Sequence, residues 1–233
     1  MQSQLPSDQD DLKRRAYKGL AIFLVVLAAL VFLPALTLAW WQAWLYFAIF
    51  AAATFAITAY FLKYDPELVA HRMSAGPTAE KEPRQKLIQG ILGFVVILLF
   101  IAPGLDRLFG WSRVPDWIAI LADIAVAAGF WIMFRAFQEN SYAASIIEMR
   151  EGQRVVTTGP YAVVRHPMYA GALLLFAGTP LALGSWWGLI LAVLAIGGVV
   201  WRLLDEEEFL IRRLPGYDEY RRQNRYRLVP PIW

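Results

Sequence analysis

The feature that most constrains the fold is residues 19–62, a stretch of 44 residues without an Asp, Glu, Lys or Arg. About 20 apolar residues are enough to cross the hydrocarbon core of a bilayer. The stretch is therefore predicted to form a hairpin of two membrane-spanning helices. We place its turn in residues 34–42, where Trp40, Trp41 and Trp44 are expected to lie at the membrane interface as an aromatic belt.

Further spans are predicted where the chain again lacks charges. Residues 87–105 carry none, and residues 117–134 carry only Asp123. Residues 168–201 are also uncharged, but 34 residues are long for one span and short for two. Breaker residues at positions 180–185 favour a tight helical hairpin there. The predicted fold is an all-α, polytopic integral membrane protein with about six transmembrane helices, the last two forming a helical hairpin.

The distribution of cations predicts the orientation of these spans. Of the 22 Lys and Arg, 20 fall in the four segments 1–18, 63–86, 135–166 and 202–233. Short cytoplasmic connections are enriched in Lys and Arg, so these segments are expected inside, with both termini cytoplasmic. The cations thus follow topology and form no single basic stripe, and no nucleic-acid partner is expected. The chain has no cysteine, which excludes thiolate metal sites, and no metal site is expected.

A loop rich in proline and glycine divides the chain into two parts. Residues 65–84 are predicted to form a cytoplasmic loop. Residues 1–84 would then comprise an N-terminal cytoplasmic segment, a two-helix hairpin and this loop. Residues 85–233 would form a second domain, in which the candidate chemistry lies.

The first polar cluster lies where the fifth span begins. Pro167 suits the first position of a helix and biases His166 toward an extended backbone. Arg165 and His166 would then lie beside the unpaired N–H groups of a helix N-terminus, where an anion is favoured. The structural alternative is that Arg165 marks the inner membrane boundary and that His166 is a buried polar residue with ordinary hydrogen bonds.

The second polar cluster is a run of four carboxylates, residues 205–208, directly after the sixth span. The helix is predicted to continue to Pro215, which makes Glu208 an exposed i,i+4 partner of Arg212. Glu207 instead shares an apolar stripe with Leu203 and its helical neighbours. A carboxylate at that place must be paired, protonated or bound to a ligand, because an unpaired buried charge is costly.

Together the two clusters resemble a known family. The motif Arg-His-Pro-x-Tyr-x-Gly at 165–171, followed by the pair at 206–207, the Pro-Gly-Tyr-x-x-Tyr at 215–220 and Arg227, resembles the isoprenylcysteine carboxyl methyltransferases. The resemblance covers roughly residues 85–233. That broad family is also similar to membrane phospholipid N-methyltransferases and to many bacterial homologues, so a bacterial inner membrane is the expected location.

The resemblance implies S-adenosylmethionine as cofactor, bound in a cytoplasmic pocket of the second domain. Arg227 would hold a carboxylate acceptor, whereas His166 would take up the proton of an amine or thiol acceptor, and these two are the expected catalytic residues. The residues expected to bind the cofactor are Tyr161, Arg165, His166, Tyr169, Gly171, Glu206 and Glu207.

The predicted function is therefore methyl transfer to a lipophilic, prenylated or otherwise lipid-like acceptor that reaches the site from the bilayer. Carboxyl methylation of an isoprenylcysteine-type substrate is one form of it. The expected partners are an amphiphilic or lipidated substrate and membrane lipids. One alternative is a nicotinamide-dependent membrane reductase of the sterol-reductase type, and another is a non-catalytic membrane scaffold, which leaves Glu207 unexplained.

Overall fold

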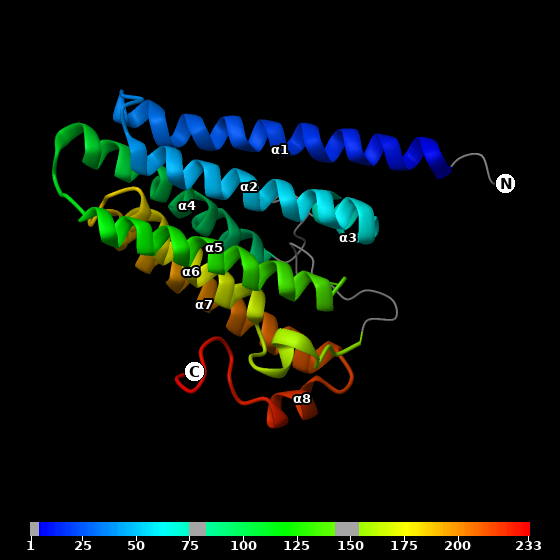
Figure 1. Ribbon diagram of the computed structural model, residues 1–233. Coiled ribbons are helices and arrows are strands. Elements are labelled where there is room, and N and C mark those ends of the chain that lie inside the picture. The colour runs from blue at the N-terminus through cyan, green and yellow to red at the C-terminus, as the bar shows by residue number, and fades with distance from the viewer. Residues whose placement is uncertain (1–4, 75–82, 143–153) are drawn as a thin grey trace.

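A computed structural model describes residues 5–74, 83–142 and 154–233, and within them every regular element is a helix (Figure 1). This confirms the predicted all-α class. The elements, in chain order, are α1 (Leu5–Ala35), α2 (Trp41–Tyr64), α3 (Pro66–Ser74), α4 (Pro83–Phe109), α5 (Asp116–Glu139), the 3₁₀ helix η1 (Gly159–Ala162), α6 (Pro167–Ala182), α7 (Gly188–Arg213) and α8 (Tyr217–Gln223).

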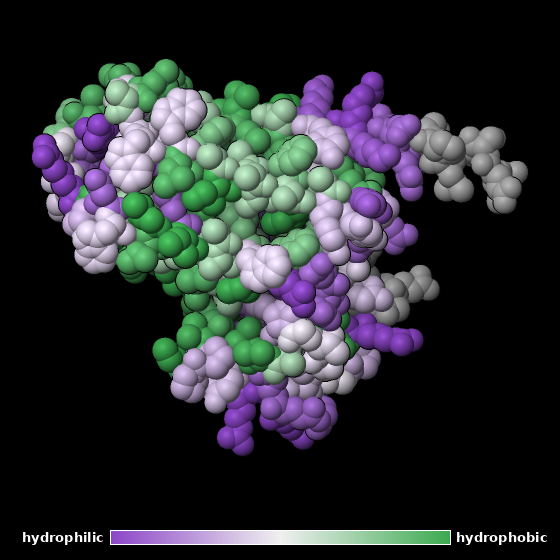
Figure 2. All heavy atoms as spheres, in the orientation of Figure 1, coloured by the Kyte–Doolittle hydropathy of each residue, from purple (hydrophilic) through white to green (hydrophobic). Residues whose placement is uncertain are grey.

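Five of these helices, α1, α2, α4, α5 and α7, are long and apolar enough to cross a membrane. The sixth predicted span is α6, which is apolar but only 16 residues long. At 1.5 Å per residue it measures about 24 Å, less than the roughly 30 Å of hydrocarbon. Apolar side chains cover the middle of the face shown in Figure 2, and hydrophilic ones gather toward its ends. The chain is an integral membrane protein.

Both predicted hairpins are present in the structure. The first turn comprises residues 36–40, between α1 and α2, and the second comprises residues 183–187, between α6 and α7. In the second turn Gly184 has a positive φ of 79°, a conformation that glycine adopts without strain. The buried hydroxyl of Ser185 donates to the carboxylate of Asp106 at 2.5 Å, which ties this turn to the end of α4.

Two of the three tryptophans in the predicted aromatic belt are exposed on the surface of the bundle. Trp41 and Trp44 are 44% and 48% exposed, as expected for the membrane interface. Trp40 is only 2% exposed and packs in the core beside Phe32. The prediction for Trp40 was wrong. Trp40 is the N-cap of α2 and has a non-helical backbone, so its ring does not share the direction of the exposed tryptophans on the helix.

The loop predicted at residues 65–84 contains a helix, α3. The carboxylate of Asp65 accepts a hydrogen bond from the N–H of Leu68 at 3.0 Å, which stabilises the first turn in the way an N-cap does. Leu68 is buried against Phe61 and Phe137, so tertiary packing holds this short segment helical. The following residues, 75–82, lie outside the described part of the chain.

The long helices pack in two rows. In one row α1 lies against α4 and α4 against α7, and in the other α2 lies against α5 and α5 against α6. The rows meet where α1 packs on α2, at the top of Figure 1, and where α6 packs on α7. Helices α5 and α6 approach most closely because glycines face each other. A Cβ atom on Gly171 would lie 2.6 Å from the carbonyl oxygen of Gly129 and 2.7 Å from Cγ of Met133. Small residues at helix crossings allow this separation in membrane proteins.

One end of the bundle collects the polar clusters of the sequence. Gln138 at the end of α5 donates to the Tyr60 hydroxyl of α2 at 2.8 Å. Near the start of α4, Gln85 accepts from Arg202 of α7 at 3.4 Å. The start of α6 meets the end of α7 through Arg165 and Glu207. By the cation rule this end is expected to face the cytoplasm.

This orientation can be tested with single cysteines in the otherwise cysteine-free chain. Cysteines replacing Gln9 and Gln223 should react with a membrane-impermeant reagent only from the cytoplasmic side, and one replacing Arg113 only from the outside. All three positions are exposed: Gln9 begins the first span, Arg113 lies between α4 and α5, and Gln223 ends α8. Opposite sidedness for Gln9 and Gln223 would mean an odd number of crossings, with the short α6 failing to span the bilayer.

Candidate active site

The start of α6 is built as the sequence predicts. Pro167 is the first residue of the helix and His166 is its N-cap. The preceding 3₁₀ helix η1 begins at Gly159, which has a φ of 56° and packs against Glu139 at the end of α5. Thr158 donates to the Glu139 carboxylate at 2.7 Å. The end of α5 therefore positions the motif that leads into α6.

The chain after α8 lies directly against this motif. The backbone N–H of Arg165 donates to the carbonyl of Tyr226 at 2.9 Å, and that of His166 donates to the carbonyl of Arg227 at 3.0 Å. The Arg165 guanidinium also donates to the carbonyl oxygens of Asn224 at 2.8 Å and Arg225 at 3.1 Å. Residues 224–227 are thus held in register with the start of α6.

Glu207 lies at the centre of this arrangement and is only 3% exposed. One carboxylate oxygen accepts from Nε of Arg165 at 2.7 Å, and the other accepts from Nε of Arg227 at 2.7 Å. Nε2 of His166 lies 3.3 Å from the first oxygen. Of the three states that the sequence allows for Glu207, the structure shows the paired one, with partners from the chain itself.

The stability of this cluster depends on each of its charged residues keeping a partner of opposite charge. Arg165 and Glu207 are both buried, whereas the side chain of Arg227 is 29% exposed. Removing one partner from a buried ion pair costs about 3 to 5 kcal/mol, because a desolvated charge is then left without compensation. Glu207 therefore joins α6, α7 and the tail (residues 224–233) into one unit that is sensitive to the loss of any member.

Glu206, although adjacent to Glu207, belongs to a second network. Its carboxylate accepts from the Tyr169 hydroxyl at 2.5 Å, and that hydroxyl accepts from Nε of Arg202 at 3.0 Å. The network extends through Gln85 of α4, whose amide nitrogen donates to Asp205. Glu206 itself is only half-buried. Successive positions on α7 thus point one carboxylate toward the tail and the other toward the surface between α6 and α4.

Three tyrosines close the cluster on the side of η1 and α8. The Tyr220 hydroxyl donates to the carbonyl of Tyr161 at 2.7 Å, and the Tyr161 hydroxyl accepts from Asn140 at 3.2 Å. Burial raises the pKa of Tyr161 and of Tyr220 to about 12 each. Burial, reinforced by the charges of Glu207 and Glu206, also raises the pKa of Tyr217. These phenols therefore stay protonated at neutral pH and act as hydrogen-bond donors.

The predicted site residues fall into four groups. Arg165, His166, Glu207 and Arg227 contact one another directly, and Tyr169 and Glu206 form the second network. Tyr161 connects to the cluster through Tyr220 and Asn224. Gly171 packs against α5 at the helix crossing. The segment before residue 154, including Gly152, lies outside the described residues.

Two contributors were missed from the sequence. Gln85 shares a helical face with buried Ile88, a spacing that could have revealed it as an inward-facing polar residue. Asn224 lies in a non-helical segment, where no periodic pattern indicates direction. Arg202 precedes Glu206 by four residues, a spacing typical of a helical ion pair, yet it is buried and donates to Tyr169.

Comparison with known proteins bears on the same residues. Residues 117–215 match the family model described as phospholipid methyltransferase. No curated protein matches the chain. The matched segment begins in α5, ends just after α7 and includes every predicted site residue except Arg227. This match confirms the predicted resemblance, and residues 117–215 are the part of the chain that carries the features of the broad group of membrane methyltransferases, to which the phospholipid methyltransferases belong.

Proposed function

We propose that the protein is an S-adenosylmethionine-dependent methyltransferase that acts on a lipid-like acceptor at the cytoplasmic end of the bundle. The observation that carries the proposal is the cluster of Arg165, His166, Glu207 and Arg227. The first three of these residues lie in the segment that matches the family model. Bound there, S-adenosylmethionine supplies a sulfonium methyl group that a nucleophile can accept directly.

The donor set of the site fits such a cofactor. The cofactor carries a carboxylate, an ammonium group and ribose hydroxyls, and so requires both anionic and cationic partners. Glu206 is half-buried and offers a carboxylate, whereas both carboxylate oxygens of Glu207 accept hydrogen bonds from guanidinium groups. We therefore assign Glu206 to cofactor binding and Glu207 to holding Arg165 and Arg227 in place. This divides the predicted pair of glutamates into two roles.

The remaining residues have tasks that depend on the acceptor. Arg227 lies in the tail, is partly exposed and could hold a carboxylate acceptor while it stays paired to Glu207. An amine or thiol acceptor must lose a proton, and His166 is the imidazole closest to the cluster. Burial of these groups beneath α8 and the tail excludes water from the site, which favours transfer to the acceptor over hydrolysis.

Ligand binding to the protein purified in detergent tests the proposal. Titration calorimetry should show binding of S-adenosylmethionine and of its product S-adenosylhomocysteine, because both carry the groups that Glu206 and the guanidiniums recognise. NADPH should give no heat of binding. Binding of NADPH alone would favour a nicotinamide-dependent reductase, and binding of neither ligand would favour a non-catalytic scaffold.

A further inference from the structure

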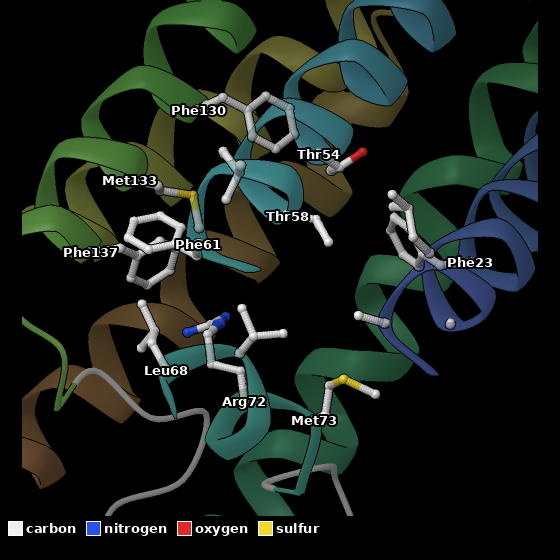
Figure 3. Close-up of a pocket in the computed structure, with 15 residues that line it drawn as sticks. Phe23, Thr54, Thr58, Phe61, Leu68, Arg72, Met73, Phe130, Met133 and Phe137 are labelled. Carbon is white, nitrogen blue, oxygen red and sulfur yellow. The ribbon is translucent and has the colours of Figure 1, made fainter. Parts of the chain in front are cut away.

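A cavity of about 370 Å³ lies between α1, α2, α3 and α5 (Figure 3). Phe23 comes from α1, Thr58 from α2, Arg72 from α3 and Met133 from α5. Three of these four helices precede residue 117, so most of the cavity wall lies outside the segment that matches the methyltransferase family. Family membership therefore does not explain this part of the molecule.

The walls of the cavity are largely hydrocarbon. Phenylalanines from three helices line it, together with leucine, isoleucine and methionine side chains. Thr54 faces the cavity but directs its hydroxyl to the Phe50 carbonyl of its own helix at 2.8 Å. Arg72 is the one charged side chain in the described lining, and its guanidinium carbon lies 4.4 Å from the centre of the Phe137 ring. A matching ligand is a hydrocarbon chain with a polar or anionic end near Arg72.

The cavity borders the candidate active site through α5 and α6. Phe61 and Phe137 of its wall pack in the same cluster as Met168, which lies beside Tyr169 at the start of α6. Met133, also in the wall, lies next to Gly171. The chemical cluster and the cavity are therefore at the same end of the bundle, on opposite sides of the α5–α6 pair.

A second recess adjoins the cavity on the outer side of the bundle. It is a groove of about 330 Å³ between α2 and α5, lined by residues such as Tyr60 and Trp131. Ile57 and Phe130 line both the groove and the cavity. Since α2 and α5 are membrane-spanning helices, the groove opens toward the acyl chains of the bilayer. A lipophilic chain can reach this wall without passing through water.

We propose that the cavity is a binding site for a single-chain amphiphile whose polar end lies near Arg72. This assignment does not depend on the proposed methyltransferase function, and it gives the N-terminal hairpin a lipid-binding role of its own. The volume lies near the lower end of the roughly 300 to 1,000 Å³ typical of ligand pockets, which favours one chain over the two of a diacyl lipid.

Photoaffinity labelling in detergent tests the assignment without requiring methyl transfer. The probes are a saturated fatty acid and an isoprenoid acid, each carrying a photoreactive diazirine on its chain. Mass spectrometry should map the crosslinks to cavity residues of α1, α2 and α5, and the stronger of the two probes identifies the type of chain. Crosslinks confined to the outward faces of the helices, with none in the cavity, would overturn the assignment.

Matched glycines provide the control variants. A Cβ on Gly19 or on Gly93 meets nothing within 4 Å, but only Gly19 lines the cavity. Gly19→Phe should weaken probe binding about tenfold or more, since each methylene kept out of an apolar site weakens binding about fourfold. Gly93→Phe should leave probe binding unchanged. Equal effects in the two variants would contradict the proposal, and Thr58→Phe provides a second obstruction should Gly19→Phe fail to fold.

Binding of S-adenosylhomocysteine, measured on the same samples, separates the two hypotheses. The affinity should be equal in the wild type, Gly19→Phe and Gly93→Phe, because neither substitution lies in the cluster around Glu207. If the wild type does not bind S-adenosylhomocysteine, the methyltransferase proposal is overturned even if the chain probe labels the cavity. Retained cofactor binding without cavity labelling would overturn only the assignment of the cavity.

Discussion

Replacement of Glu207 by glutamine is expected to destabilise the folded protein by about 3 kcal/mol, the lower end of the range for breaking a buried ion pair. The amide leaves Arg165 buried without a counter-charge, whereas Arg227 keeps part of its hydration because its side chain is 29% exposed. Thermal unfolding in detergent measures this effect. S-adenosylhomocysteine binding should weaken as well, because Arg165 and Arg227 lose the carboxylate that holds them in place.

The neighbouring residue provides a matched control for this experiment. Glu208→Gln makes the same chemical change one position along α7, but Glu208 is exposed and pairs with Arg212 on the helix surface. Exposed pairs of this kind contribute only a few tenths of a kcal/mol. Both stability and cofactor binding should therefore stay close to wild type. Losses of equal size at positions 207 and 208 would refute the central place of Glu207 in the cluster.

Replacement of Gly171 by valine is expected to have the largest effect on folding outside the charged cluster. A Cβ at this position would lie 2.6 Å from a backbone carbonyl oxygen of α5, and backbone atoms cannot move aside without separating the two helices. Overpacking of this kind costs about 3 kcal/mol or more. For a chain of this size, such a loss lowers the unfolding midpoint by roughly 6 to 12 °C.

Gly197 of α7 serves as the comparison, because a Cβ there meets nothing within 4 Å. Gly197→Val should change the midpoint little, although it adds the same isopropyl side chain to a membrane-spanning helix. If the two valine variants unfold at the same temperature, the close crossing of α5 and α6 does not limit stability. Gly171→Ala should show a smaller shift than Gly171→Val in the same direction.

The sequence predicted those features that depend on periodicity and on breaks in it. Absence of charge located the helices, and the breakers around Gly184 located the second hairpin. The apolar stripe placed Glu207 in the interior, because the side-chain direction on a helix follows from its 3.6-residue repeat. Each of these inferences needs only local information.

Features that depend on tertiary contacts were harder to predict. Asp65 and Leu68 form a helix because Leu68 finds a hydrophobic partner more than 60 residues away in Phe137, which no local pattern reveals. The partners of Glu207 were equally hidden. The sequence indicated that this carboxylate needs compensation, but Arg227 reaches it only because the tail folds back onto α6.

The pairing of the tail with the start of α6 also sets an order of events during synthesis. The carbonyls of Tyr226 and Arg227 accept the N–H groups of Arg165 and His166, so the cluster needs residues made about 60 positions after α6 begins. At 5 to 20 residues per second this interval lasts several seconds, during which the spans can enter the bilayer. The newly made spans would then be inserted before the cluster is complete, and the cluster would form only when residues 224–227 dock onto the start of α6.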